Sequence, residues 1–254
     1  MELMSLLPTE LTLVFLASLT FSFLLYNSLR FSQERVAAYR IFVGIMSTIL
    51  VLLSFITGRY YNHSFMTDPD GPNSLPENIT LCVTLGYYIF ESLYSLFNRG
   101  DTHSVMFFHH VVTSIGLATL LYYQQTGTEA NIMLGGTEIT TPILVAVRYI
   151  FKRWGRTHIL KCAVLHLVAT CIFITFRLVL GSYVMYIFVT NPKPKLIFKI
   201  YGMAIYMVGW PFTYSILQFG MKNFLQPLMK ETEPKMTSNS HKLDQNSNGT
   251  IKTD

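Results

Sequence analysis

The chain has 254 residues, of which 51% are hydrophobic and only 13% are charged, and its formal net charge is +5. Soluble domains carry about 25% charged residues, so this chain has too few charges for a water-soluble fold, and its 14% aromatic content excludes a disordered chain. Three cysteines, an odd number, provide no disulfide framework. The composition therefore indicates a multi-pass membrane protein.

The charges cluster between long apolar runs, each near the roughly 20 residues that a spanning helix needs. Seven such runs follow one another along the chain: Leu11–Leu29, Tyr39–Thr57, Ile79–Phe97, Ser104–Tyr123, Ala130–Ile150, Ile159–Val189 and Leu196–Phe219. The fifth run contains two glycines, a proline and two charges, so it either crosses the membrane or forms a re-entrant hairpin. The sequence predicts an all-α polytopic bundle of about seven spans. We expect three parts: an N-terminal transmembrane helix (1–31), a transmembrane domain (32–228) and a disordered cytosolic tail (229–254).

The basic residues fall mainly on one side of the membrane if the N-terminus lies outside and all seven runs cross. Thirteen of the 19 lysines and arginines then face the cytosol, as the positive-inside rule requires. We therefore expect a lumenal or external N-terminus and a cytosolic C-terminus. This topology also exposes the sequon at Asn62, a candidate glycosylation site. The sequon at Asn78 abuts a span, and the one at Asn248 lies in the cytosolic tail, so neither is expected to be modified.

Polar side chains recur at helical spacing in the last five runs. The third run places Glu91 on one face with Tyr87 and Tyr94, and the later runs contribute, in chain order, His109, His110, Thr113, Glu138, Arg148, His166 and Arg177. By contrast, we expect only Ser, Thr and Asn from the first two runs. Ionisable residues inside a span are costly and usually face the bundle interior or a wet cavity. The pattern favours a polar cavity, although pairing between the two acids and two arginines, or simple hydrogen bonding between helices, would also explain it.

The adjacent histidines His109 and His110 lie near the cytosolic end of the fourth run, about 9 Å in from Ser104 at 1.5 Å per residue. They point to different faces of the helix, and a neutral imidazole serves as a general base, a nucleophile or a metal ligand. A metal is disfavoured because the chain has neither HExxH nor CxxC spacing. We predict no metal and no bound cofactor, and consider the two histidines candidate catalytic residues.

The stretch His109-His110-Val111-Val112-Thr113, preceded by Arg99-Gly100-Asp101 and Met106, resembles the double-histidine signature of the TLC domain. That family includes translocation-associated membrane proteins, ceramide synthases and a membrane protein of neuronal ceroid lipofuscinosis. Residues 136–142, followed by Arg148-Tyr149, are similar to the Glu-x-x-x-Pro…Arg pattern of the smaller TLC-domain proteins. The resemblance covers about 32–227 and implies a TLC-like domain of six spans around an internal cavity. It also implies a function in lipid metabolism and a location in the endoplasmic reticulum.

The resemblance implies one function and an alternative to it. Ceramide synthases use the double histidine and a later pair of aspartates, but residues 133–138 here contain only one acid, Glu138. The resemblance therefore implies a protein of lipid homeostasis that binds membrane lipids or regulates phospholipid and sphingolipid acyl composition. An acyltransferase with acyl-CoA as co-substrate is the alternative. The expected cavity or substrate-binding residues are Glu91, Asp101, Thr113, Glu138, Arg148, His166 and Arg177.

A seven-span receptor or a transporter is a more remote alternative. The third run ends in Phe97-Asn98-Arg99 without the acidic-Arg-aromatic motif of such receptors, and the hydropathy shows no inverted repeat. The basic residues lie in short loops beside the spans, where topology explains them, so we expect no nucleic-acid partner. Homo-oligomer formation stays open.

Overall fold

The computed structural model describes residues 9–58, 69–98, 104–154, 158–227 and 229, and in these ranges it contains helices and no strand. The first four spans are α1 (Thr9–Ser32), α2 (Arg35–Thr57), α3 (Leu75–Phe97) and α4 (Ser104–Tyr123). The fifth consists of α5 (Gly127–Glu138) and α6 (Thr140–Trp154). The sixth consists of α7 (Ile159–Ile174), the π-helical segment η3 (Thr175–Leu180) and α8 (Gly181–Thr190). The seventh consists of α9 (Leu196–Gly220) and the π-helical segment η4 (Met221–Leu225). Seven helical stretches long and apolar enough to cross a membrane confirm the predicted seven-span bundle.

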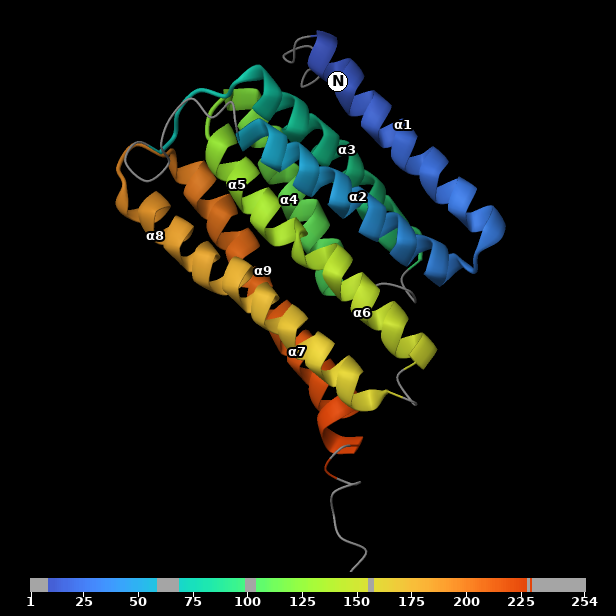
Figure 1. Ribbon diagram of the computed structural model, residues 1–254. Helices are drawn as coiled ribbons and strands as arrows, with labels where there is room; N and C mark the ends of the chain where they lie inside the picture. The colour runs from blue at the N-terminus through green and yellow to red at the C-terminus, as the bar shows by residue number, and fades with distance from the viewer. Residues whose placement is uncertain (1–8, 59–68, 99–103, 155–157, 228, 230–254) are drawn as a thin grey trace, which may run out of the picture.

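The fifth span runs in one direction and does not turn back as a re-entrant hairpin (Figure 1). The residue between its two helices, Ile139, keeps helical dihedrals of φ −56° and ψ −28°. Pro142 lies in the first turn of α6, where a missing N–H costs little. The combined stretch Gly127–Trp154 has 28 residues, which is enough to span with tilt.

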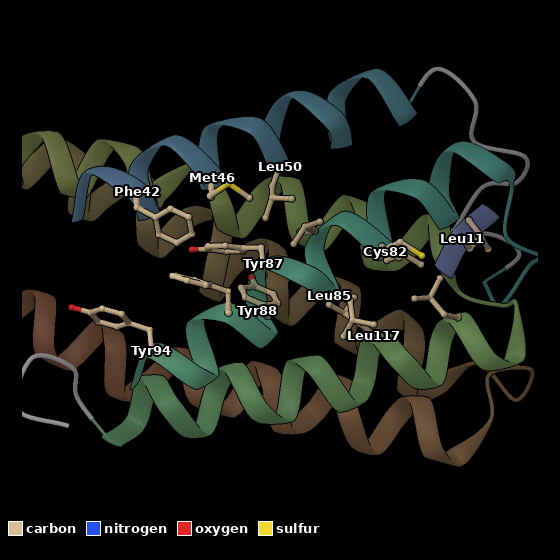
Figure 2. Close-up of a cluster of buried hydrophobic side chains, with 14 of the residues drawn as sticks. Leu11, Phe42, Met46, Leu50, Cys82, Leu85, Tyr87, Tyr88, Tyr94 and Leu117 are labelled. Atoms are coloured by element: carbon tan, nitrogen blue, oxygen red, sulfur yellow. The ribbon is translucent and has the colours of Figure 1, made fainter. Parts of the chain in front are cut away.

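The third span is the centre of the bundle and packs against α1, α2, α4 and α5. Its buried aromatic face meets Phe42, Met46 and Leu50 of α2 in the main core cluster (Figure 2). The helix α1 packs on the same cluster through Tyr26, whose ring lies 5.3 Å from that of Tyr94, and α1 and α3 approach closely at Gly86. A Cβ there would lie only 2.9 Å from the Leu19 nitrogen, so the contact requires a glycine.

The outward faces of several spans are apolar, as a surface in contact with acyl chains should be. Large exposed hydrophobic side chains include Leu24 on α1, Phe55 on α2, Leu167 on α7, Tyr186 on α8 and Met207 on α9. With these apolar faces and seven spans, the chain is an integral membrane protein. The first described residues of α1 and the end of η4 lie at opposite ends of the bundle, as an odd number of spans requires (Figure 1). Of the predicted disordered tail, 229–254, residues 230–254 lie outside the described residues.

At the α1-start end of the bundle, the segment before α3 is clamped to the turn between α4 and α5. Thr126 N donates to Gly71 O at 3.0 Å and Asn73 N donates to Gln124 O at 3.0 Å. The Asn73 side chain accepts from Gly127 N at 2.7 Å, and a Cβ on Gly127 would lie 2.6 Å from that same oxygen, so only glycine fits. This clamp fixes the outer end of the space between α4 and α5.

Candidate functional site

A cavity lies between α4, α5, η3, α8 and α9, with an empty volume of about 1110 Å³ including the part open to the outside. Most of its lining is apolar, as the side chains of Leu117, Leu120, Leu134, Val184, Phe188 and Ile205 illustrate. The clamp residue Thr126 lines its outer end. A long apolar space between membrane helices is suited to an acyl chain.

Polar side chains gather at the opposite, inner end of this cavity. His109 and Thr113 come from α4, Tyr88 from α3 and Arg177 from η3. At 1.5 Å per residue, His109 lies about 21 Å from the end of α4 and Arg177 about 20 Å from the end of α8. The two groups are thus at the same depth, roughly two thirds of the way through a hydrocarbon core of about 30 Å.

Tyr88 connects the cavity to the buried acid of α5. Its hydroxyl donates a 2.6 Å hydrogen bond to Glu138 Oε1. Its ring stacks on His110 with centroids 5.3 Å apart and an interplanar angle of 18°, and it meets His109 edge-on at 6.2 Å. One tyrosine therefore holds both histidines and the carboxylate of the fifth span in place.

Glu91 lies behind the histidines, completely buried. Its Oε2 accepts a 2.5 Å hydrogen bond from the Tyr39 hydroxyl of α2 and lies 3.7 Å from His110 Nδ1. His110 is thus enclosed between Glu91 and Tyr88, and it does not line the cavity. His109 does, with Thr113 Oγ1 3.5 Å from its Nδ1 and Phe212 edge-on at 5.6 Å. The two histidines have different environments, and only His109 is in reach of a bound molecule.

Arg177 belongs to the π-helical segment that interrupts the sixth span, a type of irregularity that is frequent at functional sites. Its guanidinium carbon lies 5.1 Å from the ring centre of Phe173 and 5.6 Å from that of Phe212. Its Nε is buried and has no hydrogen-bond partner among the described residues. Within that part of the chain neither Arg177 nor Arg148 forms an ion pair with Glu91 or Glu138, so mutual pairing does not explain these charges.

His166 and Arg148 form a second cluster, separate from the cavity. The His166 ring lies 5.4 Å from Phe219 and 5.1 Å from Phe224, and its Nε2 lies 3.3 Å from Ile216 O. Arg148 lies over Phe219 at 5.8 Å. His166 and Arg177 are separated along one span by about 16 Å. Neither His166 nor Arg148 lines the cavity, and Glu91 and Glu138 do not line it either, whereas Thr113 and Arg177 do.

Sequence reasoning also missed two functional side chains. Tyr39 was not expected, because only Ser, Thr and Asn were predicted from the first two spans, yet its hydroxyl binds Glu91. Tyr88 is adjacent to the predicted seam residue Tyr87, but its position three residues before Glu91 is a helical spacing that indicates a shared face. The predicted site residue Asp101 and the predicted glycosylation site Asn62 lie outside the described residues.

No group of three or more His, Cys, Asp and Glu side chains suitable for a metal ion occurs within the described ranges. The protein is thus a polytopic helical membrane protein with an intramembrane cavity that ends at a histidine and an arginine. A family model described as the TLC domain matches residues 35–221, from the start of α2 to the start of η4. The chain therefore belongs to the TLC domain family, with α1 outside the matched residues. No solved structure matches the chain.

Proposed function

We propose that this protein binds a membrane lipid by its acyl chain and regulates phospholipid or sphingolipid acyl composition. The observation that carries this proposal is the apolar cavity that ends at His109 and Arg177 within the bundle. The apolar walls match the hydrocarbon of an acyl chain, so the chain can pass from the bilayer into the cavity without exposing apolar surface to water. Membership of the TLC domain family, whose members include lipid enzymes, supports the same conclusion.

A variant with a blocked cavity tests this function. Gly209 lines the cavity, and a Cβ there would meet only Leu178 Cδ2, at 3.9 Å, so Gly209→Leu places its side chain in the open space. Ala146→Leu is the matched control, because Ala146 is exposed on α6 and does not line the cavity. Lipidomics of cells lacking the protein should show altered acyl chains that the wild type and Ala146→Leu restore and Gly209→Leu does not. Restoration by Gly209→Leu at equal expression would refute the proposal.

An acyltransferase is the second candidate, favoured by the presence of His109 in the cavity wall. In that reaction neutral His109 would accept the proton of an acceptor hydroxyl or amine as the acceptor attacks the acyl-CoA thioester. The C–S bond breaks, the new ester or amide forms, and the proton passes to the leaving thiolate to give free CoA. His109→Ala should then abolish transfer while the protein still binds an acyl chain; full transfer by this variant would exclude the enzyme.

Charge distribution supports an orientation with α1 starting on the lumenal or external side and the C-terminus in the cytosol. Three lysines in and just after the 191–195 turn, Lys193, Lys195 and Lys199, oppose the charge rule, but Lys195 and Lys199 have local partners. Lys195 Nζ lies 4.0 Å from the ring centre of Tyr123, and Lys199 Nζ donates to Asn191 O at 2.6 Å. We place the protein in the endoplasmic reticulum on its family resemblance, with membrane lipids as its partners.

A further inference from the structure

We propose that the lipid bound in the cavity carries an anionic group, a carboxylate or a phosphate, and that Arg177 binds this group. The inference rests on the proposed function, because it names the chemistry of the ligand held in the same cavity. It assigns the head group to the inner end of the cavity and the acyl chain to the apolar walls beyond it.

The charge of Arg177 itself calls for an anionic partner. A guanidinium stays protonated in proteins, and a cation within a membrane span needs compensation. The flanking rings of Phe173 and Phe212 provide cation–π contact but no hydrogen-bond acceptor. With Nε buried and unpaired in the described part of the chain, the group retains a directed donor for which an anion is the natural partner.

The two acids behind the cavity, Glu138 and Glu91, have other partners. Glu138 accepts from Tyr88, and Glu91 accepts from Tyr39, each through a short hydrogen bond. Neither lines the cavity, whereas Arg177 does. An anion at the inner end of the cavity therefore lies beside the cation and is separated from Glu91 and Glu138 by the wall that contains Tyr88.

Hydrogen-bond donors surround the place where the anion would lie. His109 and Thr113 line the same end of the cavity, and both can donate a hydrogen bond to an anionic oxygen. Beyond them most of the wall from Leu117 to Phe188 is apolar. Its polar members Thr137, Tyr201 and Tyr206 carry no charge, and the next charged side chain described there is Glu129 at the outer end. The cavity is thus complementary to an anionic amphiphile, because it has a cationic inner end and a long apolar body.

Competition binding on the full-length protein in detergent tests the inference. Palmitate and lysophosphatidic acid are compared, by displacement of a fluorescent acyl probe, with the neutral hexadecanol and monopalmitoylglycerol. Because a hydrogen bond to a charged group contributes about 1.5–3 kcal/mol, Arg177→Gln should weaken binding of the anionic lipids by about tenfold or more. It should leave the neutral lipids unaffected, Arg177→Lys should retain most of the preference for anions, and Arg148→Gln should behave like the wild type.

The outcomes separate this inference from the proposed function. Stronger binding of palmitate identifies a carboxylate as the group bound at Arg177, and stronger binding of lysophosphatidic acid identifies a phosphate. If Gly209→Leu removes lipid binding but Arg177→Gln keeps an unchanged preference for anionic lipids, Arg177 does not bind the anionic group. The assignment of the cavity as the lipid site is then retained. If Gly209→Leu binds every lipid like the wild type, the cavity is not the lipid site and the proposed function fails with it.

Discussion

The Tyr88 hydroxyl donates a 2.6 Å hydrogen bond to Glu138 Oε1, joining the central helix α3 to the last residue of α5. The same tyrosine ring stacks on His110 and lines the cavity. This single side chain therefore connects the lipid-sized space to the buried polar network behind it.

Loss of that hydroxyl should destabilise the bundle. Tyr88→Phe keeps the ring but leaves the buried Glu138 carboxyl without its donor, which costs about 1–3 kcal/mol. Thermal unfolding in detergent should show a lower Tm. Tyr87→Phe is the control, because Tyr87 is equally buried and no hydrogen bond of its hydroxyl occurs within the described ranges. Equal Tm values for the two variants would contradict a structural role for the Tyr88–Glu138 bond.

The Glu91 carboxylate should be sensitive to the type of replacement. Glu91→Gln keeps an acceptor for the Tyr39 hydroxyl, whereas Glu91→Ala removes it and opens a space beside His110. We expect Glu91→Ala to lose about 2–5 kcal/mol of stability, the range for large-to-Ala changes in cores, and Glu91→Gln to lose distinctly less. The free energies of unfolding in denaturant measure the difference. A Gln variant as unstable as the Ala variant would mean that the hydrogen bond from Tyr39 contributes nothing.

The two histidines should respond differently to truncation because their surroundings differ. His110 is packed between Tyr88 and Glu91, so His110→Ala should lower the Tm clearly. His109 borders the cavity, so His109→Ala should affect lipid binding or turnover more than folding. Parallel measurement of Tm and acyl-probe binding separates the two effects. Equal Tm values and equal acyl-probe binding for His109→Ala and His110→Ala would contradict this difference between the two histidines.

The polar faces of single helices could be predicted from the sequence because helical spacing determines which residues share a face. Glu91, His109, His110, Thr113, Glu138 and Arg177 do converge. A shared face does not place two residues at the same depth in the membrane. His166 shares a span with Arg177 yet lies about 16 Å away along it. Spacing also says nothing about which helices are neighbours, so the contact from Tyr39 of α2 to Glu91 of α3 could not be predicted.

The close approach of α1 to α3 should depend on Gly86. In Gly86→Ala the new methyl would lie 2.9 Å from the Leu19 nitrogen and the Ser18 side chain, which forces α1 outward. Overpacking of this kind costs about 1–3 kcal/mol. Gly44→Ala is the control, since its Cβ would make an ordinary 3.5 Å contact with Val145. Cysteine cross-linking between α1 and α3 should fall only in Gly86→Ala, and unchanged cross-linking would show that α1 docks without this contact.

Glycosylation should identify the side of the membrane that the 59–68 segment faces. We expect the endoglycosidase-sensitive mass shift to disappear in Asn62→Gln and to persist in Asn78→Gln and Asn248→Gln. Asn78 is 5% exposed, and its Nδ2 donates to Gln124 Oε1 at 2.6 Å, so this amide is not accessible to modification. A mass shift that depends on Asn248 would contradict the proposed orientation, because it would put the C-terminal segment on the glycosylated side.

Photo-cross-linking with a diazirine-bearing fatty acid tests whether an acyl chain occupies the cavity. After labelling of the full-length protein in membranes, mass spectrometry locates the adducts. We expect them on cavity residues such as Met133 and Met185, with loss of labelling when palmitate competes. Adducts confined to outward-facing residues such as Leu24 and Phe55, and insensitive to palmitate, would contradict the account.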